Sequence, residues 1–297
     1  MAEKQDLAGK VAVITGAGSG FGREFARLAA KLQMKLVLAD VQKDALAEAG
    51  AELVAQGADV VSQVTDVRKG EEVAALAAAT MQRFGAVHLL FNNAGVGAGG
   101  LLWENTIADW EWVLGVNLWG VVHGVRAFTP LMLELAGKDP DYRGHIVNTA
   151  SVAGLLSPPG LGVYNVSKHA VVTLSETLYH DLRQVKAPIG VSVLCPAFVP
   201  TGISSSFRNR PSELQNNAPP TPSQLMAQAQ VKKAVESGHL TATQVAEMTF
   251  AAIAADRFYV ITHPKILSSV ELRLQDIAEQ RNPSDPFMHK PEVKPKL

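Results

Sequence analysis

The sequence feature that most constrains the fold is a glycine-rich segment at residues 15–22, Thr-Gly-Ala-Gly-Ser-Gly-Phe-Gly, which directly follows the apolar run 10–15. A segment of helical period, residues 23–33, comes next. Glycines at such a point permit a tight turn, and they let backbone N–H groups and a helix N-terminus approach a phosphate. The order of strand, glycine turn and helix therefore indicates a nucleotide-binding α/β fold, although a purely structural turn stays open. The residues expected at the phosphates are Gly16, Ser19, Gly20, Phe21 and Gly22.

Apolar runs alternate with longer segments of helical period along the chain, as at residues 23–33, 44–56 and 71–84. Runs with consecutive apolar residues, such as 11–14, favour parallel strands that helices cover on both faces. The sequence therefore predicts a Rossmann-like, doubly wound parallel sheet with helices on both faces. Its seven strands are expected at residues 10–15, 35–40, 59–64, 87–91, 144–149, 189–194 and 258–262.

The chain shows no internal repeat and no mid-chain linker, so we expect residues 1–281 to form a single domain. Two segments depart from the alternation of strands and helices. Residues 201–238 are polar, rich in proline and too long for an ordinary connection, which predicts a lid over a binding site. Residues 282–297 contain four prolines, and we expect a loosely ordered C-terminal extension.

Charge and cysteine content narrow the possible partners. The chain has 27 basic and 28 acidic residues, so its formal net charge of -1 does not favour nucleic acid. Its single cysteine, Cys195, excludes an internal disulfide and suits a reducing compartment, and we expect the cytoplasm. The N-terminal residues do not resemble a secretion signal, and no apolar run approaches the ~20 residues that cross a bilayer. A small uncharged ligand is the expected partner.

An acidic residue, Asp40, ends the second expected strand. A carboxylate about twenty residues beyond the glycine turn can accept hydrogen bonds from an adenosine ribose, and it repels a 2′-phosphate. Val41 and Gln42 follow it, without an arginine or lysine, so NAD(H) is favoured over NADP(H). Asp40 acting only as a helix cap is the alternative. After the third strand, Asp66 and Val67 are candidates for contact with the adenine.

Tyr164 and Lys168 lie four residues apart, which places a phenol and an ammonium on one face of a helix, one turn apart. A nearby cation favours the phenolate, so we expect the pKa of Tyr164 to fall toward the neutral range. Ser151 ends the fifth expected strand and offers a hydroxyl that can orient a substrate oxygen. Taken alone, such a tyrosine and lysine pair is more often a solvated helix face.

Together these motifs resemble those of the short-chain dehydrogenase/reductase superfamily, over about residues 9–261. The residues that carry the resemblance are Gly16, Gly20, Gly22, Asn92, Asn93, Ala94, Gly95, Asn117, Ser151, Tyr164 and Lys168.

The resemblance implies a role for each catalytic candidate. Tyr164 would be the general acid/base, and Ser151 would hold the reacting oxygen. Lys168 would lower the pKa of Tyr164 and bind the nicotinamide ribose. Asn117, in a distorted helix, would hold a water that relays protons to solvent.

The resemblance also implies further cofactor contacts. Asn93 and Gly95 would form a turn that stabilises the sheet and lies against the adenosine ribose. Val199 and Thr201 would seat the nicotinamide carboxamide. The chain departs from the family pattern at Ala197, where a glycine is usual, and Pro200 puts the orientation of the lid in doubt.

The segments that flank these residues are apolar, which predicts a hydrophobic, bulky or aryl-bearing secondary alcohol or its ketone as the substrate. Arg208, Arg210 and Asn216 in the lid are candidates for a charged contact with the ligand. Residues 258–263 weakly resemble bacterial dehydrogenases that act on lignin-derived aryl alcohols. The residues expected to contact the substrate are Val96, Leu155, Leu156, Leu161 and Phe198.

Other functions stay open at this point. One is a nucleotide-binding relative with a regulatory or scaffolding role, another is a lyase or dehalogenase on the same scaffold, and a third is a reductase of steroids, 3-oxoacyl groups or sugars. No metal is expected, because the histidines lack the His-Glu-x-x-His spacing of zinc proteases. The four tryptophans, at positions 103, 110, 112 and 119, are expected to pack in the core. By the resemblance we expect a homodimer or homotetramer that pairs helices 117–135 and 164–182.

Overall fold

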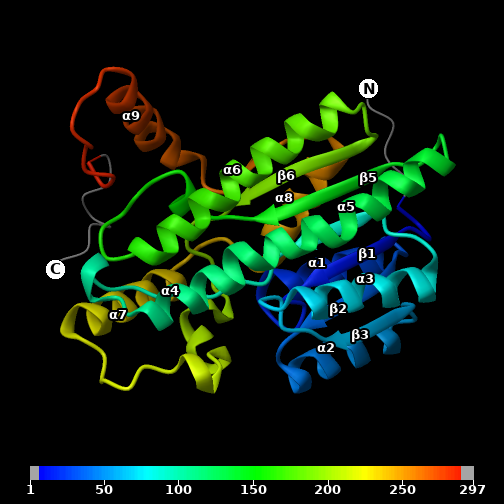
Figure 1. Cartoon of the computed structure of the whole chain (residues 1–297), viewed down its shortest axis with the longest axis horizontal. Coiled ribbons are helices and arrows are strands. Elements are labelled where there is room, and N and C mark those ends of the chain that lie inside the picture. Colours follow the sequence, from blue (N-terminus) through cyan, green and yellow to red (C-terminus); the bar gives the residue numbers. More distant parts are fainter. Residues whose placement is uncertain (1–6, 289–297) are drawn as a thin grey trace.

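A computed structural model describes residues 7–288 of the chain as one seven-stranded parallel sheet with helices on both faces (Figure 1). The order of strands across the sheet is β3-β2-β1-β4-β5-β6-β7. The predicted seven-stranded, doubly wound architecture is therefore confirmed. The strands are β1 (Val11–Thr15), β2 (Lys35–Asp40), β3 (Val60–Val64), β4 (Leu89–Asn92), β5 (Gly144–Thr149), β6 (Ile189–Cys195) and β7 (Tyr259–Ile261).

The strand order reverses between β1 and β4. From β1 the chain moves outward through β2 to β3, then returns across the sheet to place β4 on the other side of β1. At such a point the connections after the two strands leave in opposite directions, and they open a crevice at the carboxyl ends. The glycine turn follows β1 directly, so it lies at this crevice.

How far the residues of a strand are buried depends on whether the strand lies in the middle or at the edge of the sheet. β1, β4 and β5 are buried at every position, whereas the edge strand β3 alternates between partly buried and exposed residues. Central strands need side chains that can be buried on both faces, which explains the hydrophobic runs of β1 and β4, whereas β5 also buries the polar residues His145, Asn148 and Thr149. The helices are α1 (Gly20–Lys31), α2 (Lys43–Ala55), α3 (Gly70–Phe84), α4 (Ile107–Leu114), α5 (Gly120–Lys138), α6 (Gly162–Gln184), α7 (Pro222–Glu236), α8 (Ala242–Ala254) and α9 (Leu267–Ala278).

Each face of the sheet has its own core. Helices α1, α2 and α8 cover one face, where Phe91 of β4 stacks on Phe25 at 4.8 Å and lies 5.6 Å from Phe250. Helices α3, α5 and α6 cover the other face, where Phe128 and Leu178 pack against the sheet. No helix within residues 7–288 is both long enough and apolar enough to cross a membrane.

The two segments that depart from the alternation are more regular than expected. The lid region contains two short 3-10 segments, Gly202–Asn209 and Ser212–Leu214, followed by α7. The first seven residues of the C-terminal extension fold back onto α9, where the backbone N–H of Ser284 donates to Asp276 at 2.8 Å. This part of the extension is therefore attached, contrary to the expectation of loose order, and residues 289–297 lie outside the described residues.

Candidate active site

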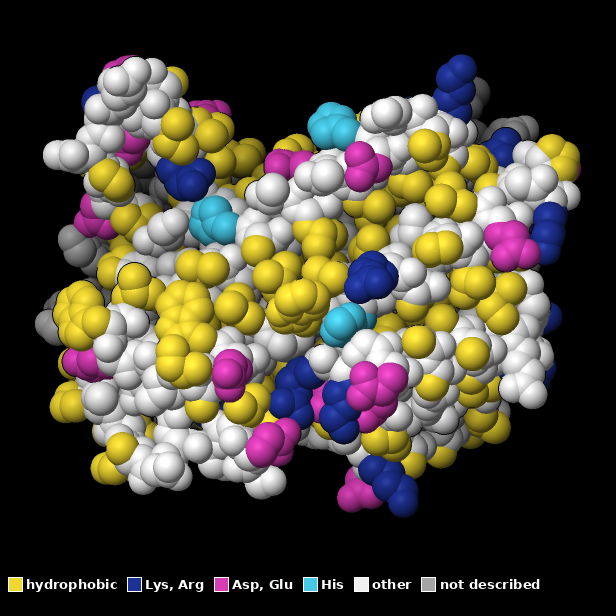
Figure 2. Space-filling view, in the orientation of Figure 1, with side chains coloured by type: hydrophobic (Ala, Val, Ile, Leu, Met, Phe, Trp, Pro, Cys, Tyr) yellow, Lys and Arg dark blue, Asp and Glu magenta, His cyan; other side chains and the backbone are white. Residues whose placement is uncertain are grey.

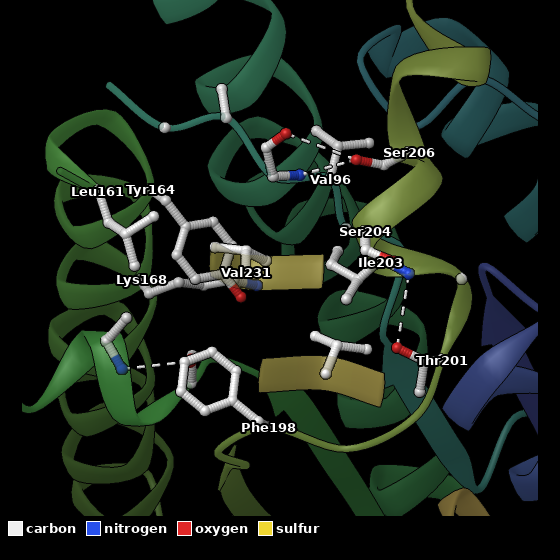
Figure 3. Close-up of a pocket in the computed structure, with 18 of the residues that line it drawn as sticks. Val96, Leu161, Tyr164, Lys168, Phe198, Thr201, Ile203, Ser204, Ser206 and Val231 are labelled. Carbon is white, nitrogen blue, oxygen red and sulfur yellow. Dashed lines mark hydrogen bonds between the residues drawn. The ribbon is translucent and has the colours of Figure 1, made fainter. Parts of the chain in front are cut away.

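A cavity of 1380 Å³ opens at the carboxyl ends of the strands. The segments after β1 to β6 all contribute to its walls, and the lid region closes one side. Figure 3 shows Tyr164 of α6 and Leu161, the N-cap residue of that helix, on one side of this cavity, facing Ile203 and Ser206 of the lid. Most residues that the sequence predicted for a nucleotide and for the chemistry meet in this one cavity.

The glycine turn lines the cavity where the chain leaves β1. Gly16 has a φ of +67°, a left-handed conformation that favours glycine, and a Cβ there would lie 2.9 Å from the Cα of Ala94. Gly16, Ser19, Gly20 and Phe21 line the cavity as expected, but Gly22 does not. Gly22 is buried behind the turn, where a Cβ would lie 2.1 Å from the carbonyl oxygen of Gly16. Its role is to let α1 pack against the turn.

Asp40 lies at the end of the cavity that the glycine turn and β2 form. Its Oδ2 accepts from the N–H of Gly18 and its Oδ1 from the N–H of Gln42, both at 2.9 Å. The N-cap of α2 is Gln42, so Asp40 is not that helix's N-cap residue. Two carboxylate oxygens offer about four acceptor positions, so Asp40 keeps capacity to accept hydroxyl groups from a ligand.

Asp66 and Val67 line the cavity after β3, as predicted. The carboxylate of Asp66 is already held by Arg68, whose Nη2 lies 2.7 Å from Oδ2. Arg68 also lines the cavity, and no pattern in the sequence pointed to it beyond its place two residues after an acid. Because Arg68 already pairs with this carboxylate, contact between Asp66 and an adenine stays a prediction.

Asn93 ties the turn after β4 to β1. Its Nδ2 donates to the carbonyl oxygen of Thr15 at 2.9 Å, and its N–H donates to the Thr15 hydroxyl at 2.9 Å. The expected structural role of this turn is therefore present. Gly95 follows it, and a Cβ at this position would lie 3.5 Å from Oδ1 of Asn117 and 3.7 Å from Nζ of Lys168. The turn thus places Gly95, a candidate for cofactor contact, next to the catalytic candidates Asn117 and Lys168.

Ser151, Tyr164 and Lys168 come together where β5 and α6 meet. Ser151 follows β5, and its hydroxyl donates to the carbonyl oxygen of Pro196 at 3.3 Å and faces the Tyr164 hydroxyl closely enough to affect its pKa. The Nζ of Lys168 donates to the carbonyl oxygen of Thr149 at 2.8 Å and lies 5.6 Å from the centre of the Tyr164 ring. Lys168 is only 3% exposed. A solvated helix face is therefore wrong for this pair.

Burial sets the ionisation of the two groups on α6. Burial raises the pKa of the Tyr164 phenol, and the nearby Ser151 hydroxyl opposes this rise. Burial also lowers the pKa of Lys168 to about 8. The predicted fall in the pKa of Tyr164 is therefore not what the structure shows, because removing the phenol from water disfavours the phenolate. A protonated phenol suits donation of a proton at neutral pH.

Asn117 lies in a π-helical turn, Gly115–Trp119, so the expected helix distortion is present. Its Oδ1 accepts from the N–H of Val96 at 2.8 Å, while its Nδ2 donates to the Val96 carbonyl at 2.9 Å and to the Ser167 hydroxyl at 3.0 Å. The side chain therefore fastens the segment after β4 to α6. The relay of protons through a water stays a prediction.

The part of the cavity beyond Tyr164 is apolar. Four of the five predicted substrate residues line the cavity, namely Val96, Leu156, Leu161 and Phe198. Leu155 does not, because it packs against the buried cluster that contains Val171 and Val193. Sequence reasoning missed α7, which presents Ala227, Val231 and Val235 to the cavity at a helical spacing of four. It also missed Phe287 in the C-terminal extension.

Val199 and Thr201 line the cavity where the chain leaves β6. Val199 is 2% exposed, and the Thr201 hydroxyl accepts from the N–H of Ile203 as the cap of the first 3-10 segment. Both residues therefore lie where a nicotinamide could bind. Their contact with its carboxamide stays a prediction.

The three lid residues predicted to contact the ligand all form hydrogen bonds within the protein. Arg210 is buried in an ion pair with Asp109 at 2.5 Å, and Asn216 donates to the same carboxylate at 3.0 Å. Arg208 donates to the carbonyl oxygens of Gly202 and Ser205. Arg210 does not line the cavity, so the structure gives it another role, whereas Arg208 and Asn216 do line it and their contact with the ligand stays a prediction.

Comparison with known proteins agrees with this geometry. The family model described as short chain dehydrogenase matches residues 10–212. A CLA biosynthesis dehydrogenase/reductase of Lactiplantibacillus plantarum is 33% identical over 282 residues, which cover 94% of this chain and 96% of that protein. A C alpha-dehydrogenase of a Sphingobium species is 32% identical over 285 residues, 95% of this chain and 90% of that protein.

A solved structure is more similar still. The crystal structure of a short chain dehydrogenase/reductase from Burkholderia phymatum in complex with NAD has 61% sequence identity to this chain. It matches with a TM-score of 0.92, covering 95% of this chain and 98% of that one. The similarity extends well beyond the glycine turn and the candidate catalytic residues, and the expected likeness to C alpha-dehydrogenases is confirmed.

Proposed function

Because this chain belongs to the short-chain dehydrogenase family, we propose that it transfers a hydride between NAD(H) and the carbon of a hydrophobic secondary alcohol or ketone. The observation that carries the proposal is that Ser151, Tyr164 and Lys168 line one apolar cavity together. A regulatory or scaffolding protein would not need these three groups in one place.

The described residues fit a dinucleotide. The glycine turn leaves room for a pyrophosphate at the N-terminus of α1, where a side chain at Gly16 would collide with Ala94. Asp40 faces the same cavity and disfavours a 2′-phosphate, which supports NAD(H) over NADP(H). The relative from Burkholderia phymatum was solved with NAD, and its 61% identity supports the same cofactor. When bound, NAD(H) supplies the hydride acceptor or donor.

The remaining chemistry is the transfer of one proton. In the reduction of a ketone, the Tyr164 hydroxyl donates its proton to the carbonyl oxygen as the carbon gains hydride. Ser151 holds that oxygen by a hydrogen bond. In the reverse direction the phenolate takes the proton from the alcohol. The Lys168 cation, held by Thr149, stabilises the phenolate while it exists.

The walls of the cavity favour a bulky apolar substrate. Leu161, Phe198 and Val231 surround the space next to Tyr164 in Figure 3. A sugar would leave buried hydroxyls unpaired there, at about 1–3 kcal/mol each. The similarity to a C alpha-dehydrogenase agrees with the aryl-alcohol likeness of residues 258–263. Steroids and 3-oxoacyl groups are the alternative carbonyl classes.

We also propose that the chain forms a homodimer or homotetramer through α5 and α6. Trp119, Leu133 and Val166 are 51%, 38% and 47% exposed on or next to these helices. The expectation that the tryptophans pack in the core is therefore wrong for Trp119, and also for Trp103, which is 80% exposed. Figure 2 shows hydrophobic side chains on the face where α4, α5 and α6 lie. Contact between two copies would remove this apolar surface from water. The single buried thiol, Cys195, suits the cytoplasm.

A scan of NADH formation over aryl alcohols, aliphatic alcohols, polyols and hydroxy acids tests the proposal. We expect turnover with 1-phenylethanol-type and bulkier aryl alcohols, and little with polyols. NADH binding without turnover of any alcohol or ketone would favour the regulatory or scaffolding alternative. A clear preference for polyols or hydroxy acids would contradict the substrate class.

A further inference from the structure

The first part of the lid, residues 202–216, crosses the cavity as a strap made of two short 3-10 segments. Within this strap only Ser206 and Arg210 are buried, so it has no apolar core of its own. Many of its residues line the cavity, among them Ile203, Phe207 and Asn209. Its position must therefore come from the side chains that attach it to the rest of the protein.

The strap is attached to two of the segments that line the cavity. Near the reacting groups, the Ser206 hydroxyl accepts from the N–H of Gly97 at 3.1 Å (Figure 3). Toward the other end, the Asn209 side chain accepts a hydrogen bond from Gln42, two residues beyond Asp40. The strap therefore spans from the catalytic group to the acid at the end of β2.

A further contact joins the strap to the segment after β3. Glu213 lies 3.2 Å from Arg68, which also holds Asp66. The side chain of Glu213 is 62% exposed, so this ion pair contributes little to the stability of the arrangement.

The ion pair between Arg210 and Asp109 of α4 differs from these contacts in its burial. Both side chains are only 3% exposed, and Nη1 lies 2.5 Å from Oδ1. Nη2 donates to Oδ1 of Asn216 at 3.0 Å and Nε to the carbonyl oxygen of Leu214 at 2.5 Å. The guanidinium carbon lies 5.2 Å from the centre of the Trp112 ring. A guanidinium with this many fixed partners has one favourable position, so it fixes the strap relative to α4.

Asp109 is itself held rigidly. Its Oδ2 accepts from the N–H of Thr106 at 2.8 Å in the capping box of α4, so the carboxylate is a fixed part of that helix. Separation of the strap from α4 would leave the Asp109 carboxylate, which is only 3% exposed, without its guanidinium partner, which is strongly unfavourable for a buried charge.

We propose that the Arg210–Asp109 ion pair anchors the strap over the bound dinucleotide and sets how fast the cofactor leaves. The inference rests on the proposed NAD(H) site. Because the strap covers the cavity from Ser206 to Asn209, a dinucleotide leaves only after the strap lifts, and lifting it breaks the buried pair. Arg210 and Asp109 are positioning residues, since neither is required to touch the reacting atoms.

Stopped-flow fluorescence of NADH release from the full chain tests the anchor. We expect Arg210→Met and Asp109→Asn to raise the dissociation rate of NADH by about tenfold or more. Asp109→Asn keeps an oxygen for the N–H of Thr106, so α4 keeps its cap. We also expect the KM for NAD to rise while kcat is kept or rises, because Ser151, Tyr164 and Lys168 are untouched.

Arg83→Met is the matched control, because it removes an exposed ion pair with Asp59 that is remote from the strap. It should release NADH at the wild-type rate. If Arg210→Met does not fold, Arg210→Lys replaces it and should still accelerate release, since an ammonium cannot bind Asp109, Asn216 and Leu214 at once. Folded variants that release NADH within about twofold of the wild-type rate would overturn the anchor. Failure of the wild type to bind NADH would instead overturn the proposed cofactor.

Discussion

The ammonium nitrogen of Lys168 lies 5.6 Å from the centre of the Tyr164 ring, one turn along the same helix. Burial acts on the two groups in opposite directions: it raises the pKa of the phenol and lowers the pKa of the amine to about 8. Each group is thus held in an environment that disfavours its charged form. The protein keeps this arrangement at a cost in stability, which is common at catalytic sites.

Lys168→Met should therefore lower the activity without lowering the stability of the folded protein. We expect turnover to fall by at least ~10²-fold, because the phenolate loses its cation. The free energy of unfolding at pH 7 should stay equal or rise by about 1 kcal/mol, because an apolar side chain avoids the burial of an amine. Urea unfolding measures the second effect. A clear loss of stability would show that the hydrogen bond to Thr149 outweighs the cost of burial.

Asp40→Asn should weaken the preference for NAD over NADP. The amide keeps an oxygen for the N–H groups of Gly18 and Gln42 but removes the negative charge that faces the cavity. We expect the ratio of kcat/KM for the two cofactors to shift toward NADP by about tenfold, corresponding to 1.4 kcal/mol. A wild type that uses both cofactors equally well would contradict the role of Asp40.

Stability should fall as the pH is lowered from 6.5 toward 4. Burial lowers the pKa of both His88 and His145 to about 4. Between pH 6.5, the ordinary pKa of a histidine, and pH 4 these two histidines take up protons in the unfolded chain but not in the folded chain. The stability that the two neutral histidines contribute is therefore full above about pH 6.5 and is lost as the pH falls toward 4. His88 also uses Nδ1 to accept from the N–H of Val11 at 3.0 Å, and protonation removes that acceptor.

Urea unfolding of the wild type and of His145→Gln at pH 7 and pH 4.5 measures this effect. Glutamine keeps a donor for the Ser192 hydroxyl, which His145 contacts at 2.8 Å, but does not titrate. The difference in unfolding free energy between the two pH values should be smaller in the variant. Equal differences would mean that His145 is not among the groups responsible.

The oligomer should dissociate when a charge is placed at the N-cap of α5. Light scattering of the wild type should give at least twice the chain mass of 31.6 kDa. Trp119→Glu, at a side chain that is 51% exposed, should shift the mass toward the monomer. Trp103→Glu is the control, because Trp103 is 80% exposed but lies outside α5 and α6. A monomeric wild type at micromolar concentration would rule out the proposed pairing.

Local sequence signals predicted the sheet and most of the cofactor site. The predicted bounds of β2, residues 35–40, matched the structure at both ends, because its apolar run, residues 36–39, is buried on both faces of the sheet. The glycine turn and Asp40 were also predictable, since each follows a strand directly and strand ends meet at one edge of the sheet.

Contacts between distant segments were not predictable in the same way. Arg210 lies 101 residues from Asp109 in the chain, and no local pattern distinguishes it from a solvated arginine. Leu155 and Leu156 are adjacent and equally apolar, yet only Leu156 lines the cavity, because the segment after Ser151 turns Leu155 into the core. The direction of the Tyr164 pKa shift was also predicted wrongly, since helical spacing shows a neighbouring cation but not the degree of burial.

The most direct test of the account compares the wild type with Tyr164→Phe in NADH formation from a bulky aryl secondary alcohol. NADH binding, measured by fluorescence, and thermal unfolding are followed in parallel, because the phenylalanine ring keeps the packing and removes only the hydroxyl. We predict unchanged binding of NADH, unchanged folding and a loss of turnover of at least ~10²-fold, the contribution typical of a general acid/base. A Tyr164→Phe variant that keeps most of the wild-type rate would contradict the account, because the proton would then come from another group.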